Sequence, residues 1–242
     1  MIRWLLTCEH GGNCVPEPWQ NYFVDADTAL RSHRGWDRGA LSTFNRLAPE
    51  IADAAFQSTT TRLLVDLNRS IGHRALFSEF TRRLSRSAKE EVLRRHYHAW
   101  RDPVIATIER WRRAGHVVIH VSVHSFARCL NGKLRDADIG LLYDPSHRLE
   151  RALCLRWRRI LRQTAADSLT RLNYPYKGTA DGFTRALRQR FPTGYAGIEL
   201  ELNEANVGRG FAHMADEIVT SVRLLRCQAE RLVSQETSER AD

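Results

Sequence analysis

The 242-residue chain lacks the features that tie a protein to an oxidising compartment or to a membrane. Its five cysteines are odd in number and form no C-x-x-C pair, which argues against a disulfide framework and a cysteine-rich zinc ribbon. No run approaches the ~20 apolar residues that span a bilayer. The apolar run in the opening segment MIRWLLTCEH is too short for a signal peptide. We therefore expect a soluble protein of the reducing cytoplasm with no membrane partner.

Internal repeats, low-complexity linkers and breaks in composition are also missing. A chain of this length can bury a sizeable core without disulfides, and its 43% hydrophobic and 27% charged residues are ordinary globular usage. We predict a single domain over residues 1–233, followed by a frayed polar tail over 234–242.

The charge is unbalanced: 37 Lys and Arg stand against 28 Asp and Glu, a net charge of +9. Such a balance is compatible with a nucleic-acid partner. However, much of the excess lies in helical stretches such as 82–95 and 151–163, which lack the interleaved aromatic side chains that stack on bases. We predict no nucleic-acid partner; the positive charge also suits an anionic small molecule.

Short apolar runs rich in β-branched residues alternate with longer amphipathic stretches. Strands are predicted at 4–7, 63–66, 117–123, 139–143 and 197–202, and helices at 38–54, 88–114, 148–166, 181–190 and 210–233. This alternation predicts an α/β fold with a mixed, largely parallel central sheet flanked by helices. Ligands bind at the carboxyl ends of strands in such sheets, and polar clusters follow several of the predicted strands.

Two of these clusters contain groups suited to ligand binding. His10 is followed by Gly11 and Gly12, which add no side-chain bulk near a ligand, although a surface histidine in a turn has the same pattern. The segment DLNR ends in Asn68 and Arg69, and a guanidinium fork matches a carboxylate. A structural Asp–Arg pair explains that segment equally well.

A third cluster lies in the segment HVSVHSF, where strand alternation places His120, Ser122 and His124 on one face. His124 is at the predicted strand end and is a candidate ligand, whereas His120 lies deeper and is expected to be a core histidine. His10 and His124, in a chain without a cysteine site, predict a metal centre.

The last predicted strand carries Glu199 and Glu201 on one face of an otherwise apolar segment. Buried carboxylates are costly unless they are paired or bind a metal, so one of them is a candidate general base. A solvated face of an edge strand is the alternative. Asp37 can cap the first long helix or bind a metal, and the glycine-punctuated loop 173–184 is predicted to be functional.

Seven segments appear in order between residue 8 and about residue 204: CEHGGNCVP, HRGWDRGA, LLVDLNRS, HVSVHSF, DIGLLYDP, NYPYKGTADGFT and YAGIELELNE. Together they resemble the N-formylglutamate amidohydrolase family. Their order also resembles the wider zinc-carboxypeptidase and aspartoacylase superfamily, which implies a phosphorylase/hydrolase-like fold.

The resemblance implies that His10 and His124 bind Zn2+. The superfamily often supplies a second ligand as Glu three residues after the first histidine, where this chain has Asn13. Another acid must then replace it. We assign Asp37, with the adjacent Glu9 as the rival and Asn13 itself left open.

The resemblance further implies that Asn68, Arg69 and Thr184 bind the substrate and that Glu201 activates water. Glu201 is preferred to Glu199 because the family's E-[LIM]-N-like ending aligns on it.

The implied activity is zinc-dependent hydrolysis of the linear amide bond in a small N-acyl amino acid, such as N-formylglutamate, or in a related carboxylate-bearing amide. Ser125 beside His124 is not expected to be a nucleophile, because the G-x-S-x-G elbow is missing. The alternative is a metal-free or non-catalytic small-molecule binding protein of the same fold, which the departure at Asn13 favours. The oligomeric state stays open.

Overall fold

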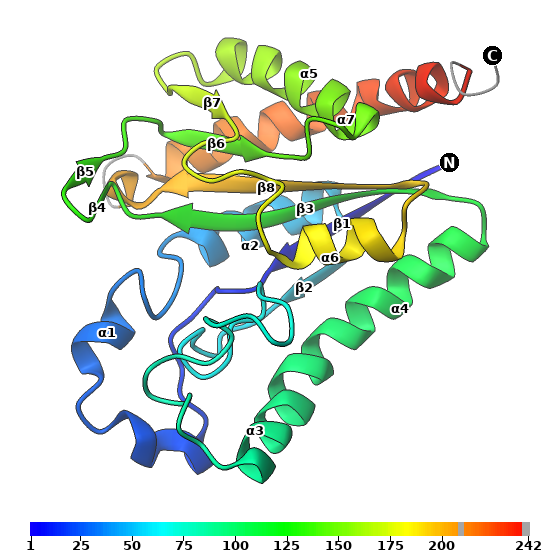
Figure 1. Cartoon of the computed structure of the whole chain (residues 1–242). Helices are drawn as coiled ribbons and strands as arrows, with labels where there is room; N and C mark the ends of the chain where they lie inside the picture. The colour runs from blue at the N-terminus through cyan, green and yellow to red at the C-terminus, as the bar shows by residue number, and fades with distance from the viewer. Residues whose placement is uncertain (208–210, 239–242) are drawn as a thin grey trace.

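The computed structural model describes residues 1–207 and 211–238 and is built around one main sheet (Figure 1). Within those ranges, six strands lie in the order β2-β1-β3-β8-β6-β7. Their bounds are β1 Ile2–Cys8, β2 Ala54–Gln57, β3 Val117–Phe126, β6 Ile139–Leu142, β7 Thr170–Leu172 and β8 Tyr195–Asn203. In this sheet the pair β6–β8 is antiparallel and the other pairs are parallel, while β4 Cys129–Leu130 and β5 Lys133–Leu134 form a separate antiparallel pair. The predicted mixed, largely parallel sheet is therefore confirmed.

Helices cover both faces of this sheet. The helices are α1 Asp27–Arg31, α2 Ala40–Ile51, α3 Arg86–Val92, α4 Ala99–Arg113, α5 Arg148–Thr164, α6 Phe183–Arg190 and α7 Phe211–Ser238. Side chains of α2, α5 and α7 pack with Ile119 and Val121 of β3 in the largest core cluster. Side chains of α4 and α6 pack with Val118 of β3 in another. Successive side chains of β3 point to opposite faces of the sheet, so one set contacts α2, α5 and α7 and the other set contacts α4 and α6. No helix of the described residues is long and apolar enough to cross a membrane.

The predicted helix over 88–114 has an interruption. It consists of α3, a π-helical turn over Leu93–His98, and α4. At the other end of the chain, α7 continues to Ser238 and so covers the beginning of the segment predicted to fray over 234–242. Residues 239–242 lie outside the described part of the chain.

The strand predicted over 63–66 is wrong. Leu63 and Leu64 lie in a turn, where the amide of Leu64 donates to the carbonyl of Thr61 (3.1 Å). The hydroxyl of Thr81 donates to the carbonyls of Leu63 (3.3 Å) and Leu64 (3.0 Å). Their side chains are buried in a separate cluster with Trp19. The apolar run therefore reflects burial in a second small core, in which side chains rather than a neighbouring strand satisfy the backbone.

The register in which the central strands pair brings their polar side chains together. In the β3–β8 pairing, His124 is opposite Glu201 and Ser122 is opposite Glu199. The parallel strands β1, β3 and β8 also end at the same edge of the sheet, where the loop after β1 begins with Glu9 and His10. Side chains distant in the sequence therefore meet at this edge.

Candidate functional site

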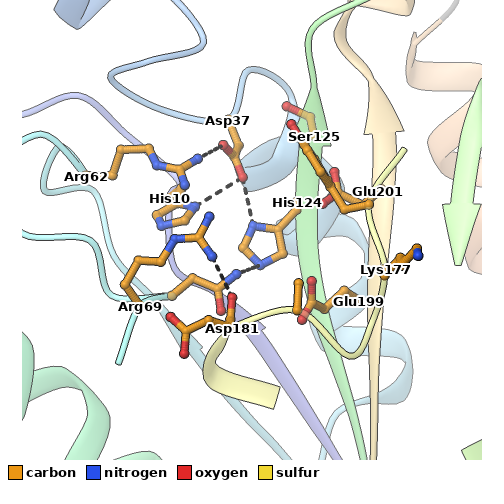
Figure 2. A pocket seen from close by; sticks show the side chains of 13 residues that line it. His10, Asp37, Arg62, Arg69, His124, Ser125, Lys177, Asp181, Glu199 and Glu201 are labelled. Carbon is orange, nitrogen blue, oxygen red and sulfur yellow. Dashed lines mark hydrogen bonds and ion pairs between the residues drawn. The ribbon is translucent and has the colours of Figure 1, made fainter. Parts of the chain in front are cut away.

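A cavity of about 150 Å³ opens at the carboxyl ends of β1, β3 and β8 (Figure 2). Six of the seven site residues predicted from the sequence line it: His10, Asp37, Asn68, Arg69, His124 and Glu201. The predicted functional loop 173–184 contributes Tyr176, Lys177 and Asp181 to the same wall. The structure thus collects most of the predicted residues in one place.

Asp37 lies between the two histidines. Its Oδ2 is 2.8 Å from Nδ1 of His124 and 3.3 Å from Nδ1 of His10, and Figure 2 shows both rings turned toward it. The three side chains are buried, and their donor atoms lie within 4.8 Å of one another. The amide of Asp37 also donates to the carbonyl of His10 (2.9 Å), which anchors the loop before α2 at the end of β1.

The other ring nitrogens of these histidines have separate partners. Nε2 of His10 lies 2.8 Å from Oδ1 of Asp66, and Nε2 of His124 lies 2.9 Å from the hydroxyl of Ser122. Such contacts fix the orientation and tautomer of an imidazole and leave its second nitrogen available to a ligand. Both rings are therefore held with Nδ1 directed at the Asp37 carboxylate.

Arg62, which was not predicted from the sequence, joins the two aspartates. Its Nη1 donates to Asp37 (3.1 Å), and its Nη2 donates to Asp66 (2.8 Å). Burial opposes the ionisation of Asp37, but the charge of His10, the hydrogen bonds with His10 and His124, and the charge of Arg62 outweigh it and hold the pKa of this carboxyl well below its usual range. Asp37 is therefore an anion at neutral pH.

The two rivals for the third ligand position face elsewhere. Glu9 is buried; it accepts hydrogen bonds from Thr7 (2.8 Å) and Ser122 (2.7 Å) and lies 3.5 Å from Nε2 of His124. Asn13 donates to the carbonyl of Leu30 (3.0 Å). Among the three candidates, Asp37 is the one that reaches the Nδ1 side of both histidines.

Glu201 and Glu199 both line the cavity but differ in their surroundings. Oε2 of Glu201 is buried and makes no hydrogen bond to any described residue, whereas Oε1 of Glu199 accepts one from Thr184 (2.5 Å). Burial is the main cause that raises the pKa of Glu201 to about 8; the charge of Asp37 adds to it, and that of His124 opposes it. Glu201 therefore belongs to the cavity lining and has a carboxyl oxygen that forms no hydrogen bond with the described residues.

The predicted substrate-binding residues differ in position. Nη1 of Arg69 donates to the carbonyl of Asp181 (2.5 Å). Its Nε is buried and has no hydrogen-bond partner among the residues that the structure describes. Oδ1 of Asn68 accepts from the amide of Phe183 (2.5 Å). Thr184 is buried beside Glu199, to which its hydroxyl donates, and it is not among the residues that line the cavity.

His120 is confirmed as a core histidine, with Nε2 2.8 Å from the Thr7 hydroxyl and Nδ1 2.7 Å from the Tyr195 hydroxyl. Burial lowers its pKa to about 4, so the ring is neutral.

A buried ion pair connects the wall of the cavity to β8. Glu150 accepts hydrogen bonds from Arg188 (2.7 Å) and from the amide of Gly197 (2.7 Å), and Arg188 donates to the carbonyl of Gly178 (2.9 Å). This pair holds the loop that carries Lys177 against the strand that carries both glutamates. Its members come from α5 and α6, and no sequence pattern indicated it.

The described residues therefore form an α/β fold with a buried His–Asp–His cluster at the carboxyl edge of a largely parallel sheet. The family model for N-formylglutamate amidohydrolase matches residues 2–207. The chain belongs to the N-formylglutamate amidohydrolase family, as its motifs predicted, and is thus a hydrolase that acts on amides.

Solved structures are similar over nearly the whole chain. A gene product from Agrobacterium tumefaciens is 24% identical with a TM-score of 0.75, and the match covers 97% of this chain and 91% of that one. N-formylglutamate amidohydrolase from Ralstonia eutropha is 17% identical with a TM-score of 0.73, covering 96% and 94%. At these identities the likeness establishes the fold. Among curated proteins there is no significant match.

Proposed function

We propose that this protein is a zinc-dependent amidohydrolase that cleaves the amide bond of a small N-acyl amino acid. The observation that carries the proposal is the convergence of Nδ1 of His10, Nδ1 of His124 and Oδ2 of Asp37 from three separate segments. Imidazole nitrogen and carboxylate oxygen are the donors that catalytic zinc sites use, and three protein ligands leave a position open.

The charges around this cluster fit a divalent cation. Asp37, Asp66 and Glu9 are buried carboxylates, and Arg62 is the cation that pairs with two of them. In the metal-free protein burial opposes protonation of His124, but the hydrogen bond with Asp37 and the charges of Glu9 and Asp37 raise its pKa to about 10. As zinc ligands both histidines would be neutral, and negative charge would then be in excess by two, which would be costly in a buried site. A Zn2+ ion would neutralise this excess.

The hydrolytic step is assigned to Glu201. A metal held by the cluster would polarise the amide carbonyl and acidify water. Glu201, through its free Oε2, would accept a proton from the attacking water and return it to the amine nitrogen as the C–N bond breaks. The products are a carboxylic acid and a free amino acid, and no covalent enzyme intermediate is required.

Substrate orientation is assigned to Arg69 and Asn68. The guanidinium of Arg69 would hold the carboxylate of the amino acid, since its planar fork matches two carboxylate oxygens. Asn68 lies beside His124, with its amide nitrogen 3.5 Å from Nε2, and would hydrogen-bond the same carboxylate. Binding of this kind fixes the scissile amide and thereby contributes to the rate.

Metal analysis followed by an activity screen tests the proposal. Protein purified without chelator should contain about one zinc per chain, and chelator-treated protein should take zinc up with micromolar affinity or better. N-formyl-L-glutamate and a panel of other N-acyl amino acids should release free amino acid only from the zinc-loaded protein. Protein that takes up no zinc and hydrolyses none of these amides, yet binds one of them, would instead be the non-catalytic binding protein.

A further inference from the structure

A second cavity lies on the other side of Arg62 from the catalytic one. Its volume of about 360 Å³ is within the range of roughly 300–1,000 Å³ that is typical of small-molecule pockets. The two cavities share Arg62 as a lining residue. The family's activity, as described above, makes no use of this second space.

The charged lining of this cavity is dominated by arginine. It consists of four arginines and two carboxylates: Arg34, Arg62, Arg74, Arg82, Asp66 and Glu79. Arg34 pairs with Glu79, and Arg62 donates to Asp66 from both Nε (3.2 Å) and Nη2 (2.8 Å). Each carboxylate of this lining therefore has an arginine partner. Arg74 and Arg82 form no ion pair with a carboxylate in the described ranges 1–207 and 211–238, although Arg82 interacts electrostatically with Glu79. The six charged side chains of the lining carry a net charge of +2.

We propose that this cavity binds a phosphate monoester or a similarly small, doubly charged oxyanion through Arg74 and Arg82. A concave surface with excess charge of one sign concentrates ions of the opposite sign, and guanidinium groups donate paired hydrogen bonds to phosphate oxygens. Leu63 and Phe77 form an apolar part of the same lining, which would accommodate the carbon skeleton of an ester.

Occupation of this cavity would be transmitted to the catalytic site through Arg62. Arg62 donates to Oδ2 of Asp66, and Oδ1 of the same carboxylate lies 2.8 Å from Nε2 of His10. An anion that drew the guanidinium outward would weaken its contacts with Asp66 and with Asp37. Any such coupling is reciprocal, so catalytic-site ligands would also change the affinity for the anion.

Calorimetric titration of the metal-free protein with inorganic phosphate tests the site without requiring activity. We expect a dissociation constant below about 1 mM. Arg74→Ala/Arg82→Ala should weaken binding at least about tenfold. The matched control is Arg31→Ala/Arg86→Ala, which removes the same charge from exposed arginines that have carboxylate partners of their own. It should bind as the unmodified protein does.

The proposed anion site would be refuted if the protein did not bind phosphate at about 10 mM, or if both double variants lost the same affinity for phosphate. It would also be refuted if Arg69→Ala lost phosphate binding, because the anion would then bind in the catalytic cavity. Phenyl phosphate, titrated in parallel, should bind more tightly than phosphate; weaker binding would overturn the monoester assignment.

In the zinc-loaded enzyme, saturating phosphate should change KM at least about twofold, an effect absent from Arg74→Ala/Arg82→Ala. Unchanged kinetics would overturn the coupling while the binding result stands.

Discussion

Replacing Glu201 by glutamine separates the proposed chemistry from folding and metal binding. The residue is only 4% exposed, and its Oε2 has no hydrogen-bond partner among the described residues, so the amide keeps the shape and breaks no hydrogen bond at that atom. Because burial raises the pKa of this carboxyl to about 8, the unmodified group is largely protonated at neutral pH in the metal-free protein. The free energy of unfolding of the metal-free protein should therefore change by no more than about 1 kcal/mol.

Turnover should respond very differently. A general base contributes about 10²–10⁴-fold, so Glu201→Gln should raise the activation barrier by about 3–5 kcal/mol. A bound cation next to Asp37 would lower the pKa of Glu201 and make the carboxylate available as a base. The rate of the unmodified enzyme should accordingly rise with pH until Glu201 is ionised, and the glutamine variant should lose that dependence.

Glu199→Gln is the matched control, because it changes the neighbouring carboxylate on the same strand and retains an oxygen that can accept from Thr184. The assay is steady-state kinetics on a cleaved N-acyl amino acid, with zinc content measured for each protein. We expect the control to lose less than about tenfold in kcat. Near-normal turnover in Glu201→Gln, together with a large loss in Glu199→Gln, would refute the assignment of the base.

Three further predictions concern the metal, the substrate and pH. Asp37→Ala should lower zinc occupancy more than Glu9→Ala or Asn13→Ala, measured by elemental analysis; greater loss in Glu9→Ala would reassign the third ligand. Arg69→Ala should raise KM about tenfold or more with a smaller effect on kcat, since a guanidinium–carboxylate contact exists before the transition state; the opposite split in kinetics would assign Arg69 to chemistry. His120, whose pKa is lowered from 6.5 to about 4, should contribute about 3 kcal/mol of stability that is present above pH 6.5 and lost as the pH falls toward 4. Urea unfolding of the metal-free protein should show a weaker pH dependence in His120→Gln, and an unchanged slope would contradict this.

The sequence by itself predicted the sheet's central strands and the residues directly attached to them. Strand alternation is a local property with a period of two, so placing His124 on one face with Ser122, and Glu201 on one face with Glu199, required no knowledge of the rest of the chain. The order of the motifs was also sufficient to indicate the family, since it depends on residue identity and spacing alone.

Only the tertiary structure decided how these residues meet. The sequence left Glu9, Asn13 and Asp37 open as the third ligand, because the direction in which a loop side chain points depends on the segments packed around it. The apolar residues of the segment 63–66 are buried without a neighbouring strand. A buried turn and a buried strand can have the same run of apolar residues, so the local pattern does not distinguish them. The contact of His10 with Asp66 joins residues that are 56 positions apart, and that distance in sequence is closed only by the packing of the whole domain.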